Sequence, residues 1–409
     1  MNFKTITIDK WQQFENVEIN FHERLTVITG ANGSGKTTIL NILAKHFGWD
    51  VQSLATPKMD VQSRIWKWLT GFFTNDSNTQ NKRGEIEYSN GVKANIIVPQ
   101  QVGPQYNIEI ENRQTINCFF IPSHRSIFRY QVLNSIPTHG AIDKGQAFNK
   151  VSNSSKNRYF GSSDQSSSFH MKETLVTWNI FGRGNEDMVP NEKLLEYYKG
   201  FEDTLKTVLP TELGFKKFVV RNFEIVLECD SGDFIIDAAS GGISSIIDFA
   251  WQIYMYAADE KGSFTVIIDE VENHLHPTMQ RRILPDFVKA FPNVSFIVST
   301  HSPLIVGSVK DSNVYILRFN KEKKVTTQKL DLINKAKTAT EILDEVLGVS
   351  FTMPVWAEEK LIEVVQKYAR TDVTEKTFND MRKELSQIGL EKLIPEAITN
   401  LIQEKDEKN

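Results

Sequence analysis

The residues from Gly30 to Thr38 read GANGSGKTT, and their types and spacing suit the binding of a nucleoside triphosphate. They match the pattern G-x-x-x-x-G-K-[ST] without a mismatch. In such a loop the backbone N–H groups close around phosphate oxygens, and the following helix adds the positive end of its dipole. We expect Lys36 to reach the β- and γ-phosphates and Thr37 to place its hydroxyl on Mg²⁺. The predicted phosphate-binding residues, called the phosphate loop below, are Gly30, Ala31, Asn32, Gly33, Ser34, Gly35, Lys36, Thr37 and Thr38.

A strand and a helix have to flank this loop. Residues 25–29 (LTVIT) are apolar and β-branched, which predicts a strand, and residues 38–47 (TILNILAKHF) have helical periodicity. This strand–loop–helix context favours a phosphate loop over a glycine-rich turn that matches the pattern by chance.

Acidic and histidine side chains follow two further predicted strands. Residues 264–268 (FTVII) form a continuous apolar run that ends in Asp269 and Glu270, and residues 294–300 (VSFIVST) end in His301. We expect Asp269 to hold Mg²⁺ through water and Glu270 to polarise the attacking water. His301 would contact the γ-phosphate or that water; the alternative is a structural histidine.

A third candidate anion site precedes a long apolar helix. The helix begins at the residues Ser240, Gly241 and Gly242, and the N–H groups at its start point outward. The triplet is weak evidence alone, because S-G-G occurs in many loops. Its place in the order phosphate loop, S-G-G helix, D-E strand and histidine strand is more informative.

That order resembles the ABC-class ATPases over roughly residues 1–310. Residues 30–37 match the Walker A motif, residues 240–242 the signature motif, and residues 264–270 the Walker B motif with its catalytic glutamate. His301 matches the switch histidine, and residues 273–276 (NHLH) occupy the D-loop position. In this class the signature of one subunit closes over the ATP of another, so the resemblance implies an ATP-sandwich dimer or a higher even oligomer.

Within the class, the opening residues 3–21 resemble the SMC, RecF and OLD branch. The stretch DEVENHLHPTMQRR, with STHSP after it, is similar to ATPases of the OLD type and of bacterial anti-phage defence, such as the Septu and PARIS subunits. Several positions depart from the usual pattern: Val271 and Glu272 replace Pro-Thr, His276 replaces Asp, and Ala239 replaces Leu. These departures bear on contacts between subunits and on the hydrolysis rate.

The Q-loop glutamine of this class has no clear counterpart. The predicted strand 118–121 runs into Pro122-Ser123-His124-Arg125 at the expected place, and such P-S-x-R segments resemble those of the defence ATPases. Gln100 and Gln101 are weaker candidates.

Length and composition limit the kinds of partner that this chain is expected to have. The 409 residues allow a large core, and a net charge of −4 does not favour a strongly basic nucleic-acid binder. The two cysteines, Cys118 and Cys229, fit neither a disulfide framework nor a metal site, and no signal peptide opens the sequence. The most apolar helix, residues 246–258, is interrupted by Asp248 and Gln252 and is expected in the core. A cytoplasmic protein without membrane contact is predicted.

The predicted fold is α/β: an ABC-type P-loop ATPase core, made of a mixed sheet with an antiparallel subdomain, plus a helical lobe and a helical C-terminal tail. The predicted segments are residues 1–124 for the first part of the core, 125–215 for the inserted lobe, 216–335 for the second part of the core and 336–409 for the tail. The insert has no sustained heptad repeat, so no long coiled coil is expected. Strand-like pieces in residues 84–121 predict an antiparallel sheet packed on the core.

Residues 149–170 are rich in serine and asparagine, which predicts a mobile loop. This loop would either order on a partner or on DNA, or be a tolerated linker. Basic and aromatic residues surround it, a pattern used in single-strand binding but equally explained by a solvated surface. DNA is therefore kept as a candidate partner. These residues are Arg125, Phe128, Arg129, Tyr130, Lys144, Lys150, Lys156, Arg158 and Tyr159.

Other segments have simpler interpretations. Residues 173–209 look mainly helical, and Lys321 to Lys324 are expected in a hairpin turn. Past residue 335, helices are predicted over 339–349, 356–368, 375–388 and 395–404. They would cap the core or dock a partner. The OLD family carries a TOPRIM nuclease in this place, but the D-x-D that it requires does not follow residues 354–359, so no built-in nuclease is expected.

Three functions remain. The first is an ATPase subunit of an anti-phage defence complex that senses an invader and controls a separately encoded nuclease or toxin; the P-S-H-R and HLHP segments favour it. The second is a RecF-like DNA-repair ATPase that binds DNA as an ATP-dependent dimer. The third, a transporter nucleotide-binding subunit, is disfavoured by the large insert and the HLHP region.

Overall fold

The computed structural model describes residues 1–59, 66–69, 81–99, 103–125, 127–137, 143–161, 165–257, 262–330, 355–369 and 375–387. Contacts divide the chain into two units, residues 1–342 and residues 343–409, and each is described by itself.

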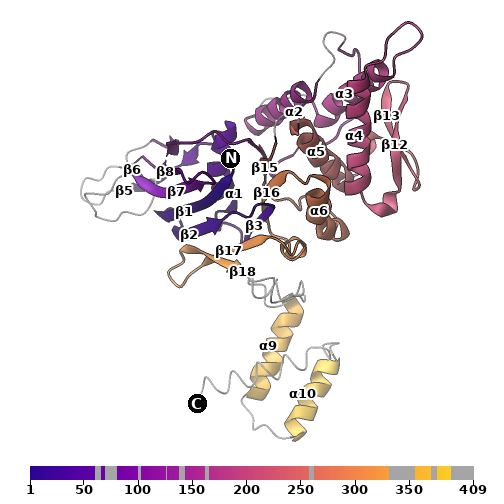
Figure 1. Ribbon diagram of the computed structural model, residues 1–409. Helices are drawn as coiled ribbons and strands as arrows, with labels where there is room; N and C mark the ends of the chain where they lie inside the picture. The colour runs from indigo at the N-terminus through magenta and orange to yellow at the C-terminus, as the bar shows by residue number, and fades with distance from the viewer. Residues whose placement is uncertain are drawn as a thin grey trace. The chain divides into compact units, whose positions relative to one another are not determined.

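The first unit is built on an eleven-stranded mixed sheet (Figure 1). Its strand order is β10-β8-β7-β1-β2-β18-β17-β3-β16-β15-β11. One half is parallel and consists of β11 (Cys118–Ile121), β15 (Phe264–Ile268), β16 (Val294–Thr300), β3 (Leu25–Gly30) and β17 (Asn313–Phe319). All residues of β3, β11, β15 and β16 are buried, as their apolar runs predict. The carboxyl ends of these strands therefore meet at one edge of the sheet.

The other half of the sheet is antiparallel. It consists of β1 (Phe3–Trp11), β2 (Phe14–Asn20), β7 (Lys82–Tyr88), β8 (Lys93–Ile97) and β10 (Glu109–Glu111). The antiparallel strands predicted in residues 84–121 are present, but they extend the main sheet instead of packing on it, because β7 pairs directly with β1, with Ile6 opposite Ile86. β18 (Val325–Leu330) joins the halves, antiparallel to β17 and parallel to β2. Its hairpin with β17 turns over residues 320–324, as predicted.

Short elements complete this unit. They are η1 (Lys45–Phe47), β4 (Ser53–Leu54), β5 (Thr56–Met59), β6 (Trp66–Leu69), β9 (Gln105–Tyr106) and α7 (Pro303–Val306). Helix α1 (Lys36–Ala44) follows the phosphate loop, and α6 (Pro277–Ala290) begins at Pro277, where a missing N–H costs nothing. The predicted α/β class with a mixed sheet is confirmed.

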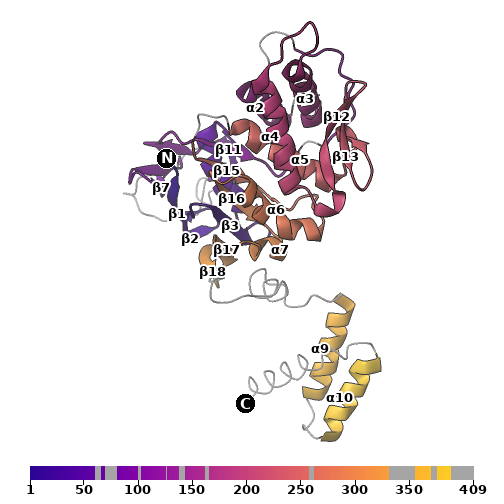
Figure 2. The same cartoon turned by 45° about the vertical axis from the view of Figure 1, so that its right-hand side comes forward.

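A lobe stands beside the parallel half of the sheet (Figures 1 and 2). Its helices are α2 (Lys144–Tyr159), α3 (Ser167–Arg183), α4 (Glu192–Val208) and α5 (Gly241–Tyr256). It is not wholly helical. A three-stranded sheet of β12 (Phe215–Arg221), β13 (Glu224–Cys229) and β14 (Phe234–Ile235) packs on α3 and α4, between the turns η2 (Thr211–Leu213) and η3 (Ile236–Ala238).

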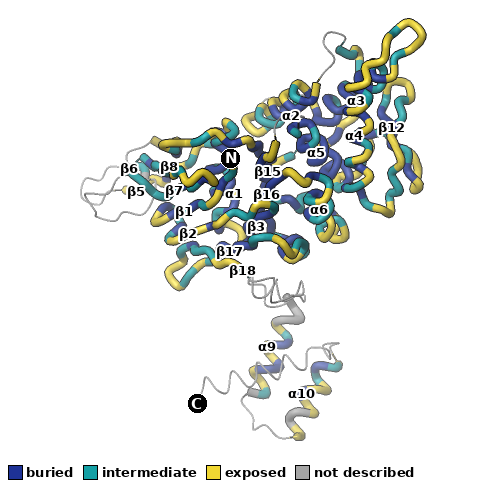
Figure 3. Tube along the Cα trace, in the orientation of Figure 1, coloured by how far each residue is buried: buried dark blue, intermediate teal, exposed yellow. Residues whose placement is uncertain are grey.

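The predicted mobile loop at residues 149–170 was wrong. Most of it is helix: α2 runs to Tyr159 and α3 begins at Ser167, while residues 162–164 lie outside the described part. Asp143 caps α2 by accepting a hydrogen bond from the Gln146 N–H. Phe148, Val151 and Ser154 then bury one stripe at helical spacing (Figure 3). Tertiary packing of this narrow stripe outweighs the polar composition.

The second unit contains α9 (Val355–Ala369) and α10 (Glu375–Gln387), close to two of the predicted helices. Lys367 and Glu384 form an ion pair of 2.7 Å between them. The helices predicted over 339–349 and 395–404 lie outside the described residues. Among the described helices, none combines the length and the apolar character needed to cross a membrane. Both cysteines are buried and unbonded.

Candidate nucleotide-binding site

The phosphate loop connects the end of β3 to the start of α1, as predicted. Gly30, Gly33 and Gly35 have φ values of 146°, 77° and 93°, a region that favours glycine. A Cβ at Gly35 would overlap the ring of Phe14, and one at Gly30 would lie 2.5 Å from the carbonyl oxygen of Leu317. The loop is therefore shaped by backbone that only glycine adopts without strain.

Lys36 is 5% exposed, and its Nζ turns back into the loop. It donates to the carbonyl oxygens of Gly30, at 2.9 Å, and Ala31, at 3.1 Å. Burial lowers the pKa of Lys36 to about 8, although nearby carboxylates, Asp269 first, oppose the shift. The ammonium thus has neutral partners inside a loop shaped to surround an anion.

Thr37, Asp269 and Ser299 meet at the carboxyl edge of the sheet. The Thr37 hydroxyl lies 3.0 and 3.2 Å from the two carboxylate oxygens of Asp269. Ser299 Oγ donates to Asp269 Oδ1 at 2.6 Å. Burial raises the pKa of Asp269, while the two hydroxyls oppose the shift. The structure therefore brings together the two predicted metal-site residues, which come from distant parts of the sequence.

Glu270 follows directly and has φ 47°, in the left-handed region that is unusual for a residue with a side chain. Its N–H donates to Ser299 Oγ at 2.8 Å, and its Oε2 accepts from Asn273 Nδ2 at 2.8 Å. Its Oε1 lies 4.0 Å from His301 Nε2. The carboxylate is about one-third exposed, so it is oriented by the protein and still open to solvent.

His301 lies between the glutamate and the lysine. Its Nδ1 is 3.5 Å from Lys36 Nζ, and its Nε2 faces Glu270. Burial, and then the charge of Lys36, lower the pKa of this imidazole. The neutral ring that results can donate or accept a hydrogen bond at each nitrogen.

The sequence analysis did not assign a site role to Glu272, yet this residue contacts the candidate site residue His301. Its Oε1 accepts a hydrogen bond from the His301 N–H. Its Oε2 is buried and has no partner among the described residues. The available signal was its departure from the usual Pro-Thr at the D-loop position.

Arg125, kept in the sequence analysis as a candidate DNA contact, instead contacts the backbone beside the candidate catalytic residues. Its guanidinium donates to the carbonyl oxygens of Asp269 at 2.9 Å, Asn273 at 3.3 Å, and Glu270. It also stacks 4.4 Å from the ring centre of Phe249 on α5. The segment 122–125 follows β11 at the expected Q-loop place, whereas Gln100 and Gln101 lie outside the described residues.

Several basic residues kept as candidate DNA contacts are engaged by other residues of the same chain. Lys144 Nζ lies 3.9 Å from the ring centre of Tyr254, and Lys156 Nζ lies 4.5 Å from that of Phe47. Lys150 pairs with Glu173 at 2.8 Å. The interleaving of basic and aromatic residues in this stretch is therefore largely explained by internal packing.

The signature residues lie at the start of α5, with Ser240 as the N-cap. Ser240 and Gly241 are exposed, and within the described part of the chain no hydrogen bond joins them to the phosphate loop. A Cβ at Gly242 would lie 3.2 Å from the carbonyl oxygen of His274, at the D-loop position. The structure thus places this motif beside the D-loop of the same chain.

The donor set fits a nucleotide with a divalent cation. The loop N–H groups and Lys36 suit phosphate, and the buried hydroxyl of Ser34 has no partner among the described residues. Thr37 and Asp269 offer the hard oxygen ligands that Mg²⁺ prefers.

Comparisons with known proteins agree with this arrangement. A family model described as "AAA domain" matches residues 5–224, and one described as "AAA ATPase domain" matches residues 186–306. The probable ATPase of retron Ec83 from Escherichia coli is 27% identical over 217 residues, 49% of this chain and 38% of that protein. The Septu protein PtuA of Bacillus thuringiensis is 21% identical over 412 residues, 93% of this chain and 96% of that protein.

Among solved structures, the SMC head domain from Thermotoga maritima superposes with a TM-score of 0.43 and 14% identity, covering 81% of this chain and all of that one. The chain thus spans less than half of the retron ATPase and nearly all of the Septu protein. The predicted resemblance to Septu ATPases is confirmed. Because the first family model matches more than half of the residues, the chain belongs to the AAA-domain family of ATPases.

Proposed function

We propose that this chain is an ABC-type ATPase that dimerises around ATP and regulates a separately encoded effector, a nuclease or a toxin, in bacterial anti-phage defence. The observation that carries the ATPase part is the convergence of Lys36, Thr37, Asp269, Glu270 and His301 at the carboxyl edge of the parallel strands. The Septu and retron relatives support the defence role.

Each residue has a distinct part in the proposed reaction. Lys36 exchanges the carbonyl oxygens of Gly30 and Ala31 for phosphate oxygens, a charge-assisted and therefore stronger interaction. Thr37 would hold Mg²⁺ directly and Asp269 would hold it through water, and the metal would neutralise charge on the β- and γ-phosphates. Asn273 orients the Glu270 carboxylate, which accepts a proton from the attacking water.

His301 completes the γ-phosphate side of the proposed site. Its neutral ring donates a hydrogen bond to the phosphate or to the attacking water, while Glu272 fixes its backbone. One ring nitrogen faces Lys36 and the other faces Glu270, so the ring lies between these two residues.

The exposed signature supports the proposal of a dimer. Ser240, Gly241 and Gly242 offer a helix N-terminus to an anion but make no hydrogen bond to their own phosphate loop in the described residues. A second copy would supply these groups to the ATP of the first. ATP binding then closes the dimer and hydrolysis opens it, which shifts the population between two states.

The test is the substitution Glu270→Gln. The variant should bind ATP, hydrolyse it at least about 100-fold more slowly because the general base is lost, and accumulate as a dimer. Hydrolysis is measured by phosphate release and the dimer by light scattering with ATP and Mg²⁺. Glu322→Gln, in the exposed β17–β18 hairpin, is the matched control and should behave as the wild type. A wild-type rate in Glu270→Gln would contradict the assignment of the base.

The defence part is tested by native mass measurement on protein purified from its own operon with ATP and Mg²⁺. An assembly with a second, co-encoded polypeptide is expected, and the sequence of that polypeptide would identify the effector chemistry. An ATP-dependent dimer that instead carries DNA would favour a RecF-like repair ATPase.

A further inference from the structure

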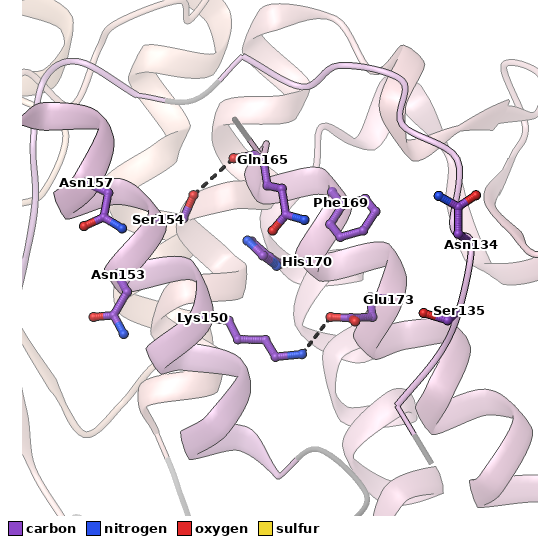
Figure 4. A pocket seen from close by; sticks show the side chains of 10 residues that line it. All are labelled: Asn134, Ser135, Lys150, Asn153, Ser154, Asn157, Gln165, Phe169, His170 and Glu173. Atoms are coloured by element: carbon purple, nitrogen blue, oxygen red, sulfur yellow. Dashed lines mark hydrogen bonds and ion pairs between the residues drawn. The ribbon is translucent and has the colours of Figure 1, made fainter. Parts of the chain in front are cut away.

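The lobe contains a pocket of about 800 Å³ that the proposed ATPase reaction does not use (Figure 4). It is lined by α2 and α3 on two sides and by residues 134–135 on a third. None of the predicted site residues lines it. Its volume falls within the range of ligand-binding pockets.

His170 is a buried polar residue in the lining of this pocket. The residue is 9% exposed, and its Nδ1 is buried without a hydrogen-bond partner among the described residues. Figure 4 shows the ring between α2 and the segment of residues 134–135. Burial lowers the pKa of His170, so the ring is neutral and its nitrogen atoms can donate or accept. Because Nδ1 is closed to solvent, a ligand would meet the ring at its pocket-facing edge, where the imidazole offers a neutral hydrogen-bonding group.

The charge of the lining argues against a phosphorylated ligand. Among the described residues of the lining, Lys150 and Glu173 are the only charged ones, and they form an ion pair of 2.8 Å between α2 and α3 (Figure 4). The lysine is therefore neutralised by its partner. A nucleotide or nucleic-acid backbone would need positive charge that this pocket does not have in excess.

The lining is instead rich in side-chain amides. Asn153 and Asn157 lie one helical turn apart on α2, Asn134 lies on the facing segment, and Gln165 precedes α3. The side chains of the three asparagines form no hydrogen bond with the described part of the chain. Each offers one carbonyl acceptor and one NH₂ donor, the complement of a peptide group.

The spacing of these amides suits an extended chain. One turn of α-helix rises about 5.4 Å, and equivalent peptide groups of an extended chain recur about every 6.6 Å. Phe169 adds an apolar surface beside the amides, with its ring centre 5.7 Å from that of His170. We propose that this pocket binds a short extended peptide segment of a second protein through Asn134, Asn153, Asn157 and His170.

The experiment uses the full chain and an array of overlapping 12-residue peptides. One set tiles the proteins encoded beside this chain, and the other tiles the proteins of a phage that infects the host, so that the two sources of peptide are distinguished. Hits are titrated by fluorescence anisotropy without ATP, so that failure here leaves the proposed ATPase function untouched. A labelled 12-nucleotide single strand is titrated in parallel.

The expected result is a peptide from one set that binds the wild type and loses at least 10-fold in affinity with Asn153→Ala/Asn157→Ala. Both positions are exposed on α2, where alanine favours the helix, so the variant should fold. Asn149→Ala is the matched control, since it is exposed on the same helix outside the pocket, and it should bind as the wild type. His170→Phe, which removes the nitrogen atoms from the buried ring, should also weaken binding.

Three outcomes would overturn the proposal: no peptide binds above background, the hits bind Asn153→Ala/Asn157→Ala as tightly as the wild type, or the single strand binds in a pocket-dependent way and the peptides do not.

Discussion

Two buried lysines, one in the phosphate loop and one in the lobe, hold their charge in different ways. Lys36 points its ammonium at two neutral carbonyl oxygens, and burial lowers its pKa to about 8. Lys172, on α3, is fully buried and donates to Asp237 at 2.6 Å and Glu224 at 2.8 Å. Burial by itself lowers the pKa of Lys172, but its hydrogen bonds to Asp237 and Glu224 outweigh burial and raise it.

The difference separates a binding group from a structural one. The partners of Lys36 are neutral and replaceable, so an anion that enters the loop finds a cation with unused electrostatic attraction. Lys172 pairs with carboxylates from β13 and η3. These ion pairs join α3 to the segment that precedes Ser240. Removing the two lysines should therefore damage different properties.

The largest expected effect is on the stability of Lys172→Met. The substitution leaves two carboxylates without their partner, and breaking a buried pair in this way costs about 3–5 kcal/mol. Lys36→Met should change the free energy of unfolding by no more than about 1 kcal/mol, because burial of that ammonium is unfavourable. Urea unfolding followed by circular dichroism, without nucleotide, measures both. Equal unfolding midpoints for the two variants would remove the distinction.

The next effect is on nucleotide binding. Lys36→Ala should weaken ATP binding at least about 100-fold, because hydrogen bonds from a charged donor contribute about 1.5–3 kcal/mol each. Isothermal titration with ATP and Mg²⁺ measures the change. Lys321→Ala, in the exposed hairpin, is the control and should keep the wild-type affinity. ATP binding to Lys36→Ala at that affinity would mean that the loop does not need its lysine.

The parallel half of the sheet was predictable because each strand carries its own signal. Apolar runs ending in Gly30, Asp269 and His301 are buried on both faces, so periodicity and motif agreed. The lobe was not predictable in the same way. Residues 149–170 have the composition of a loop, and contacts of α2 with distant residues stabilise the helix there, such as that of Phe148 with Tyr256, whose ring centres are 4.9 Å apart.

The site shows the same division. Lys36, Thr37, Asp269, Glu270 and His301 follow from a local pattern, and the structure brings them together. Two further contributions to this site are contacts with the backbone, which side-chain type does not reveal. Arg125 acts through three carbonyl oxygens and Glu272 through an N–H group, so neither could be assigned from residue identity.

A smaller effect is expected when pH is varied. Since the pKa of Lys36 in the folded chain is about 8, ATP affinity should fall about tenfold per pH unit above pH 8 as the ammonium loses its proton. The effect on folding stability has the opposite sign. Between pH 8 and 10.5 the lysine is protonated more often in the unfolded chain than in the folded one, so its contribution to the free energy of unfolding rises with pH. Lys36→Arg stays charged and should show no such fall in affinity, as titrations from pH 7 to 9.5 would reveal.

The smallest effect concerns Arg125, which combines features of both lysines. It is paired with neutral carbonyl oxygens, as Lys36 is, but those oxygens belong to the backbone of Asp269 and Glu270, so it also has a structural part. Lysine cannot reproduce a planar fork that serves three carbonyl groups and stacks on Phe249. In Arg125→Lys, Glu270 should leave its left-handed conformation more often, which lowers kcat about fivefold and leaves ATP binding unchanged.

A merely structural role for Arg125 would lower the unfolding midpoint without this selective loss of kcat. Steady-state hydrolysis and ATP titration on the same preparation separate the two, and Arg129→Lys, at an exposed position four residues on, is the control. If Arg125→Lys weakened ATP binding as much as it slowed hydrolysis, the guanidinium would be supporting the whole edge of the sheet and not the glutamate. The comparison between a binding cation and a structural cation would then place Arg125 with Lys172.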